Sequence, residues 1–306
     1  MKTIKYLLFV LPAILQAQFG SNENLDNWPP EIDSDTTYTY KVIDDTKLNL
    51  WVFNRSKVND SVKKPAIVFF FGGGFRIGTP NQFVEHSKYL SARGMVSIVV
   101  DYRVLSRNKT KPIKCLNDAK SAIRWVRKHS EILGIDPNRI VASGGSAGGA
   151  LAAATGTISM FDEENEDLSI SSKPNAMILF NPALINSSVE EYQFSEARAQ
   201  NMTISRFGVK PELFSPYNFI NDQTPPTIIF HGDKDDKVNP RTAELFNQKM
   251  KKFGNECHLH MYKGQNHGFF NFGIASNGPF VDTIRKVDDF LVNLGYIDSL
   301  PVSTSM

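Results

Sequence analysis

The sequence predicts an α/β fold with a mostly parallel central sheet and helices on both of its faces. Two continuous apolar runs, AIVFFF (66–71) and VSIVVDY (96–102), are typical of strands covered on both sides. Two helix-patterned segments, 81–94 and 116–133, alternate with strand-like runs and end at Gly94 and Gly134. Such alternation over about 250 residues implies parallel strands joined by crossover helices.

The remaining elements complete this sheet. TYTYKVI (37–43) and LNLWVF (48–53) have β patterns and predict a hairpin. Further short strands are expected at RIVASG (139–144), AMILFNPAL (176–184) and TIIFHGD (227–233). We therefore expect one domain over 37–298. Residues 186–221 are irregular and carry aromatic side chains, and they predict a small insertion that covers the sheet edge.

The N-terminal residues resemble an export signal. Lys2 and Lys5 precede an apolar run, and Ala17 offers a cleavage point, so we expect a signal peptide over 1–17 and a polar leader over 18–36. The run is short for a bilayer span, and an N-terminal membrane anchor is the alternative interpretation. Export predicts a secreted or periplasmic protein without stable membrane insertion.

Charge and cysteine content narrow the function classes. Removing residues 1–17 would take two of the 34 basic residues and no acid, which leaves 32 residues of each sign. A balanced chain of this kind is not expected to bind nucleic acid. The two cysteines, Cys115 and Cys257, lie far apart in sequence, and buried thiols are favoured over a disulfide.

A nucleophile motif follows one predicted strand. In IVASGGSAGGALAAA (140–154), a strand pattern ends at G-x-S-x-G and a helix of small residues follows. Ser146 must lie on a strained turn, where side chains at Gly144 and Gly148 would collide with neighbouring backbone. The motif predicts Ser146 as the nucleophile, and a glycine-rich turn with an idle serine is the alternative.

A serine nucleophile needs a base and an orienting acid. His267 lies in a loop just beyond a predicted strand, where catalytic groups of parallel sheets gather. His86 and His129 are expected to be solvated on polar helices, and an H-x-H zinc site at His258 and His260 lacks further ligands nearby.

The acid remains open at this level. Asp233, Asp235 and Asp236 all follow the strand TIIF, and the residue types alone do not choose among them. Whichever acts, the chain order of serine, acid and histidine is that of α/β-hydrolases.

Several motifs together resemble the hormone-sensitive-lipase-like esterases of the α/β-hydrolase superfamily. The resemblance covers roughly residues 40–295. It rests on FGGGF (71–75), DYR (101–103), DAKSAIRWV (118–126), GIDPNRIVASGGSAGG (134–149), SPYNFI with TPPTIIFHGDKDDKV, and GQNHGF. The family's H-G-x-x-D-x-x-V pattern, counted from His231, selects Asp235 as the acid, with Asp233 as the leading alternative.

The resemblance also implies an oxyanion hole formed by the backbone N–H groups of Gly73, Gly74 and Ala147. Such donors stabilise the charge of a tetrahedral intermediate, and glycine permits their close approach. The family usually has a histidine before the three glycines, which braces the loop, and this chain has Phe71. The change puts the support of the loop in doubt and leaves Ser146, Asp235 and His267 unaffected.

The predicted function is carboxylic-ester hydrolysis without a metal or organic cofactor. Phe71 before the glycines resembles exported bacterial carbohydrate esterases, so an acetylated polysaccharide is the expected substrate, as for acetylxylan esterases. A general carboxylesterase for small hydrophobic esters is the alternative. A non-catalytic binding protein of the same fold would have lost one of the three catalytic side chains.

Overall fold

A computed structural model describes residues 28–54 and 62–300 of the 306-residue chain. The predicted signal peptide 1–17 and most of the predicted leader 18–36 lie outside the described residues. Trp28, in the described part of the leader, has its ring under the guanidinium of Arg107 at 3.6 Å. The limits 37–298 of the predicted domain stay a prediction.

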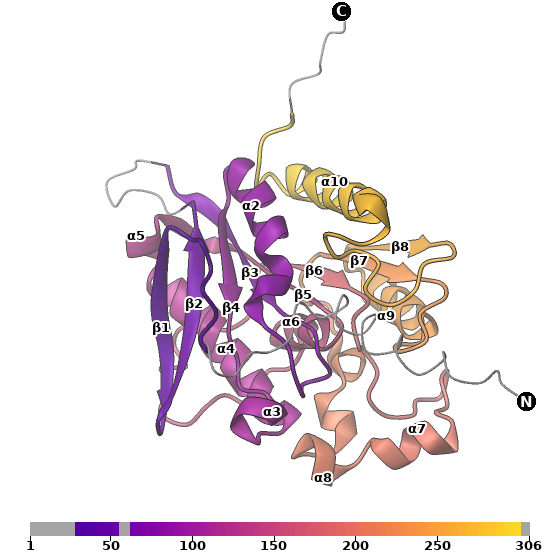
Figure 1. The fold of residues 1–306 in the computed structure, drawn as a ribbon. Coiled ribbons are helices and arrows are strands. Elements are labelled where there is room, and N and C mark those ends of the chain that lie inside the picture. Colours follow the sequence, from indigo (N-terminus) through magenta and orange to yellow (C-terminus); the bar gives the residue numbers. More distant parts are fainter. Residues whose placement is uncertain (1–27, 55–61, 301–306) are drawn as a thin grey trace, which may run out of the picture.

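Eight strands of the described chain form one sheet in the order β1-β2-β4-β3-β5-β6-β7-β8 (Figure 1). Pairing is parallel from β4 through β8, and β1 and β2 add to the β4 edge in antiparallel fashion. The mostly parallel sheet is therefore confirmed. The strands are β1 (Thr36–Ile43), β2 (Thr46–Phe53), β3 (Lys64–Phe70), β4 (Val96–Val100), β5 (Ile135–Gly145), β6 (Ala176–Phe180), β7 (Thr227–Gly232) and β8 (Cys257–Tyr262).

The helices connect these strands and cover the sheet. The longer ones are α2 (Val84–Ala92), α4 (Pro112–Lys128), α6 (Ala147–Thr157), α9 (Arg241–Lys252) and α10 (Gly278–Asn293). The short helical turns are η2 (Pro80–Phe83), α3 (Leu105–Asn108), α5 (Ser130–Leu133), α7 (Glu196–Asn201), α8 (Ile204–Phe207), η3 (Pro211–Phe214), η4 (Pro216–Phe219) and η5 (Ala275–Asn277).

Two hydrophobic cores lie on opposite faces of the sheet. Val68 and Phe70 of β3 belong to one core together with residues of α4, α6 and α9. Ile67 and Phe69 alternate with them and belong to the other core, with residues of α2 and α10. Figure 1 shows α2 and α10 together over one face. Burial on both faces explains why these strands are continuous apolar runs.

The predicted hairpin and helices are present with small changes. β1 and β2 pair from Ile43 opposite Thr46, so a two-residue turn joins them. The segment 81–94 starts as η2 and continues as α2, and the segment 116–133 is interrupted at His129 between α4 and α5. Gly134 ends α5 with φ of 67°, a left-handed conformation that suits glycine.

The expectation that His86 is solvated is wrong. Its side chain is fully buried among the rings of Phe69, Phe83, Phe180, Phe270 and Phe280. Among the neighbouring residues of α2, Lys88 is exposed and Glu85 partly exposed, whereas His86 and Ser87 are buried. Burial lowers the pKa of His86 to about 3, so the imidazole is neutral.

His129 also differs from the expectation of a solvated side chain. It is half-buried, and its ring stacks on Trp125 with 4.1 Å between ring centroids. Cys115 and Cys257 are both buried free thiols, as predicted. Burial raises the pKa of the Cys257 thiol to about 12.

Candidate active site

Ser146 lies on a sharp turn between β5 and α6. Its backbone has φ of 54° and ψ of −114°, outside the ordinary regions for a residue with a side chain. A Cβ at Gly148 would come within 2.0 Å of the Phe70 carbonyl oxygen, and one at Gly144 within 2.5 Å of Gly148. Glycine is therefore required on both sides of Ser146, which agrees with the predicted strained turn.

His267 joins Ser146 to Asp235 in one hydrogen-bonded chain. His267 Nε2 lies 2.9 Å from Ser146 Oγ, and His267 Nδ1 lies 2.7 Å from Asp235 Oδ2. The three side chains follow the carboxyl ends of different strands, β5, β7 and β8. An ionised Asp235 accepts a hydrogen bond from the Nδ1–H group, which leaves Nε2 as the acceptor for the serine hydroxyl.

The surroundings of Asp235 keep its carboxyl ionised. Asn181 Nδ2 donates to Oδ2 at 2.7 Å, and the backbone N–H groups of Lys237 and Val238 each donate to Oδ1 at 2.9 Å. Burial alone would raise the pKa of Asp235. Hydrogen bonds with His231 and His267, together with the electrostatic interaction with the His267 ring, outweigh burial and hold this pKa well below its usual range.

The two rival carboxylates have other partners. Asp233 accepts the backbone N–H of Gly264 at 2.6 Å, and Asp236 forms an exposed ion pair with Lys237 at 3.0 Å. Of the three candidate acids in this loop, Asp235 is the one that contacts His267.

Gly73, Gly74 and Ala147 line the same cavity as Ser146 and His267. This cavity has a volume of about 640 Å³. Ala147 is the first residue of α6, where a backbone N–H has no acceptor within the helix. Gly73 has φ of 128°, and a Cβ there would meet the Ile77 carbonyl oxygen at 2.0 Å. The predicted oxyanion-hole residues are thus brought together beside Ser146.

The glycine loop is held by Gln82, a residue that sequence reasoning missed. Gln82 Oε1 accepts the backbone N–H of Gly72 at 2.6 Å, and Gln82 Nε2 donates to Asn271 Oδ1 at 3.0 Å. Asn271 in turn donates to the carbonyl of Gly268, next to His267. A single amide therefore links the glycine loop to the histidine loop. The sequence carries no signal for this link because its members are far apart along the chain.

Phe71 is also held, although the family's usual histidine is missing. Its side chain is 1% exposed and its ring stacks on Tyr102. The Tyr102 hydroxyl donates to the Phe71 carbonyl oxygen at 2.6 Å. Further along the loop, Arg107 Nη1 donates to the Gly78 carbonyl oxygen at 2.7 Å. The loop is braced through its backbone.

The other histidine pair has no metal-site geometry. His258 Nε2 lies 2.8 Å from Glu256, and His260 stacks on Phe230. Over residues 28–54 and 62–300, no three histidine, cysteine or acidic side chains are grouped closely enough to hold a metal ion.

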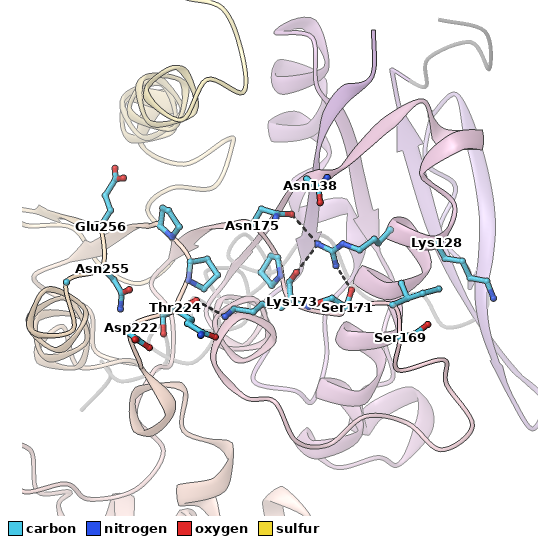
Figure 2. A pocket seen from close by; sticks show the side chains of 17 residues that line it. Lys128, Asn138, Ser169, Ser171, Lys173, Asn175, Asp222, Thr224, Asn255 and Glu256 are labelled. Atoms are coloured by element: carbon cyan, nitrogen blue, oxygen red, sulfur yellow. Dashed lines mark hydrogen bonds between the residues drawn. The ribbon is translucent and has the colours of Figure 1, made fainter. Parts of the chain in front are cut away.

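A larger groove, of about 840 Å³, lies at the opposite ends of the strands (Figure 2). Its lining includes residues just before three strands. Asn175 and Glu256 directly precede β6 and β8, and Thr224 lies shortly before β7. Figure 2 shows polar side chains there that bond to neighbouring groups; Lys173 Nζ, for example, donates to the Gln223 carbonyl oxygen at 2.6 Å. This groove contains none of the predicted catalytic residues, so the smaller cavity at Ser146 is the candidate active site.

The fold, together with the G-x-S-x-G turn at the cavity, defines the chain as an α/β-hydrolase. Comparison with known sequences shows a match to the BD-FAE family over residues 55–250. The chain belongs to the BD-FAE family, a hormone-sensitive-lipase-like group of α/β-hydrolases, and it is a carboxylic ester hydrolase.

Individual relatives agree with this assignment. The chain is 28% identical over 272 residues to an acetylxylan esterase of Xylanibacter ruminicola, covering 86% of this chain and 51% of the relative. It is 25% identical over 250 residues to the esterase LipC of Mycobacterium tuberculosis, covering 78% and 60%. The chain thus spans about half the length of the curated relatives it matches.

Solved structures of esterase 2 from Thermogutta terrifontis cover more of both chains. The native form has a TM-score of 0.84 and 43% identity, over 90% of this chain and 98% of the other. The propionate-bound form has a TM-score of 0.83 and 44% identity, over 90% and 99%.

Within residues 28–54 and 62–300, no helix combines the length and the apolar character that crossing a bilayer requires.

Proposed function

We propose that this protein is an exported serine esterase that removes short acyl groups, above all acetyl, from carbohydrate. The observation that carries the proposal is the hydrogen-bonded chain from Asp235 through His267 to Ser146 at the wall of a cavity. The acetyl and carbohydrate parts draw support from the acetylxylan esterase relative and from the short acid in a Thermogutta esterase structure.

In the proposed acylation step, Ser146 Oγ attacks the ester carbonyl carbon while His267 Nε2 takes the hydroxyl proton. Asp235 holds the imidazole in the required tautomer and stabilises its charged form. The carbonyl oxygen becomes an oxyanion that accepts hydrogen bonds from the N–H groups of Gly73, Gly74 and Ala147. His267 then gives its proton to the leaving alcohol as the carbon–oxygen bond breaks, which leaves an acyl-enzyme on Ser146.

Deacylation repeats the same roles with water. His267 takes a proton from water as the water oxygen attacks the acyl carbon, and the second tetrahedral intermediate uses the same backbone donors. Its collapse returns the proton from His267 to Ser146 Oγ and releases the carboxylic acid. Every step uses side chains and backbone groups of this chain together with water.

A general carboxylesterase for small hydrophobic esters is the second candidate. Ile77, Met202, Phe207 and Val238 line the cavity, and such apolar walls suit a hydrophobic acyl or alcohol group.

One experiment separates the two candidates. We expect kcat/KM on para-nitrophenyl esters to be highest for acetate and to fall toward octanoate, with acetate released from acetylated xylan. Ser146→Ala should remove both activities. A maximum at octanoate without release from polymer would favour the general carboxylesterase, and equal rates for wild type and Ser146→Ala would overturn the esterase mechanism.

Export is part of the proposal and rests on the basic and apolar start of the sequence. The N-terminal sequence of protein recovered from outside the cytoplasm should begin just after Ala17. An intact Met1 on membrane-bound protein would support the anchor interpretation instead.

A further inference from the structure

Basic side chains gather around the candidate active-site cavity. Arg76 comes from the loop after the glycines, Arg198 from α7, and Arg206 from α8. Lys237, beside Asp235, is a fourth cation in the lining. No aspartate or glutamate is among the described residues that line this cavity. The charge is local, because the whole chain has a formal net charge of only +2.

The three arginines differ from Lys237 in having no carboxylate partner. Lys237 pairs with Asp236 at 3.0 Å. Within residues 28–54 and 62–300, no acidic side chain lies within ion-pair distance of Arg76, Arg198 or Arg206, and the buried Nε of Arg198 has no hydrogen-bond acceptor. Glu196 precedes Arg198 by two helical positions, a spacing that points two side chains in different directions.

Two of these guanidinium groups lie over aromatic rings. Arg198 lies 4.6 Å from the ring centre of Phe194, and Arg206 lies 5.5 Å from that of Phe207. A cation–π contact attracts the guanidinium charge without using its N–H groups as hydrogen-bond donors. Arg206 donates one of them to the Asn201 carbonyl oxygen at 3.2 Å.

The arginines also repel one another. Burial lowers the pKa of Arg206, and the charges of Arg76 and Arg198 lower it further. Three like charges at one cavity are unfavourable for the empty protein, and a bound anion would relieve this repulsion. A guanidinium can donate two parallel hydrogen bonds to two oxygens of one anionic group, and both a planar carboxylate and a tetrahedral sulfate offer such a pair of oxygens.

We propose that the substrate carries an anionic oxygen group near the scissile ester, as in an acylated acidic carbohydrate, and that Arg76, Arg198 and Arg206 bind this group. The inference rests on the proposed function of the same cavity. It narrows the substrate from acetylated carbohydrate in general to acetylated carbohydrate with carboxylate or sulfate groups.

A matched pair of acetate esters tests the charge requirement directly. The probes are meta-acetoxybenzoate, which is anionic, and its methyl ester, which is neutral and has the same acetyl group. We expect wild type to prefer the anion in kcat/KM by about tenfold or more, the scale of one charge-assisted hydrogen-bonded pair. Raising the salt from about 20 to about 300 mM should reduce this preference by screening.

Variants then test whether these arginines cause the preference for the anionic ester. Arg198→Gln and Arg206→Gln should each lower the ratio of anionic to neutral kcat/KM several-fold. Arg285→Gln, an exposed arginine on α10, removes the same charge elsewhere and should leave the ratio unchanged. Circular dichroism checks that each variant is folded, and the wild-type ratio tests the proposal without any variant.

Oligosaccharides identify the source of the anion. Acetylated oligogalacturonates test a carboxylate, acetylated sulfated oligosaccharides test a sulfate, and acetylated xylo-oligosaccharides are the neutral control. Faster Ser146-dependent acetate release from either anionic set supports the proposal and names the group. Equal or faster release from the neutral set, with a probe ratio near one, would overturn the proposal while the esterase function stands. Absence of Ser146-dependent hydrolysis on every ester would instead refute the proposed function.

Discussion

The ring of Phe71 stacks on the ring of Tyr102, with 4.1 Å between centroids and 15° between planes. The Tyr102 hydroxyl also donates a hydrogen bond to the Phe71 carbonyl oxygen, so the same two residues make two contacts. These contacts support the start of the glycine loop from the strand side. They give a physical reason why a chain without the family's usual histidine can keep the same loop.

Phe71→His should therefore keep appreciable activity. The hydrogen bonds that support the loop are made to the Phe71 carbonyl oxygen and the Gly72 N–H. The substitution leaves these backbone atoms in place. We expect kcat/KM on a short-chain ester to stay within about tenfold of wild type, because backbone donors stabilise the oxyanion. Complete loss of activity in a soluble, folded Phe71→His protein would contradict this account.

Tyr102→Phe should lower the free energy of unfolding by more than its small change in side-chain volume suggests. The variant keeps the stacked ring but leaves the Phe71 carbonyl oxygen without the hydroxyl donor. Losing one partner of a buried hydrogen bond costs about 1–3 kcal/mol, and we expect the free energy of unfolding to fall by that amount. Urea unfolding measures it. Unchanged stability together with unchanged kcat would show that the hydroxyl does not support the loop.

Asp235→Asn tests which carboxylate orients His267. The amide cannot stabilise a charged imidazole and favours the wrong tautomer, so kcat should fall by about 10⁴-fold. Asp233→Asn is the matched control, since an asparagine oxygen can still accept the Gly264 N–H. Its kcat should stay close to wild type. Similar losses in both variants would mean that the contact with His267 does not identify the catalytic acid.

Gln82 should act as a positioning residue. Gln82→Leu removes both the acceptor for Gly72 and the donor to Asn271, which loosens the glycine loop relative to the histidine loop. We expect kcat to fall by about tenfold with little change in KM, because misplaced groups affect the transition state most. Asn81→Ala, at an exposed neighbouring position, is the control. A rise in KM alone would argue for a role in substrate binding.

His86 should make stability sensitive to acid. In the unfolded chain its pKa is about 6.5, whereas in the folded protein burial lowers the pKa to about 3. Between these values the unfolded state binds more protons, so the free energy of unfolding falls as the pH falls below about 6.5. The loss approaches about 1.4 kcal/mol for each pH unit.

Urea unfolding of His86→Leu at about pH 7.5 and about pH 4.5 checks this linkage. The variant lacks the titrating group and should lose less stability on acidification than wild type. His258→Gln, at an exposed histidine, should behave like wild type. An identical pH dependence in all three proteins would show that His86 does not contribute.

Local patterns predicted the parts of the site that depend on neighbouring residues. The turn at Ser146 needs Gly144 and Gly148 within two positions, so the motif and its strand–helix context can be read directly from the sequence. The choice of Asp235 over Asp233 needed the family resemblance, because both follow the same strand. The two carboxylates differ only in their partners in the segment after β8. Asp233 accepts from Gly264, and Asp235 contacts His267.

Contacts between distant segments could not be predicted. Gln82 and Asn271 are 189 positions apart, and no periodic pattern links them. The burial of His86 was missed for a related reason. Its polar neighbours Glu85 and Lys88 dominate the local composition, whereas the direction of one side chain on α2 decides its environment. The arginines at the cavity come from three segments that meet only in the fold.

The groove at the amino ends of the strands has a practical consequence for attaching this protein to a surface. Six residues of strand place it about 20 Å from the carboxyl ends, where the cavity at Ser146 opens. Both native cysteines are buried, so Lys128→Cys, at the rim of the groove, would add one accessible thiol (Figure 2). A resin coupled through that thiol would orient the cavity toward the solution, where even a bulky ester can reach it.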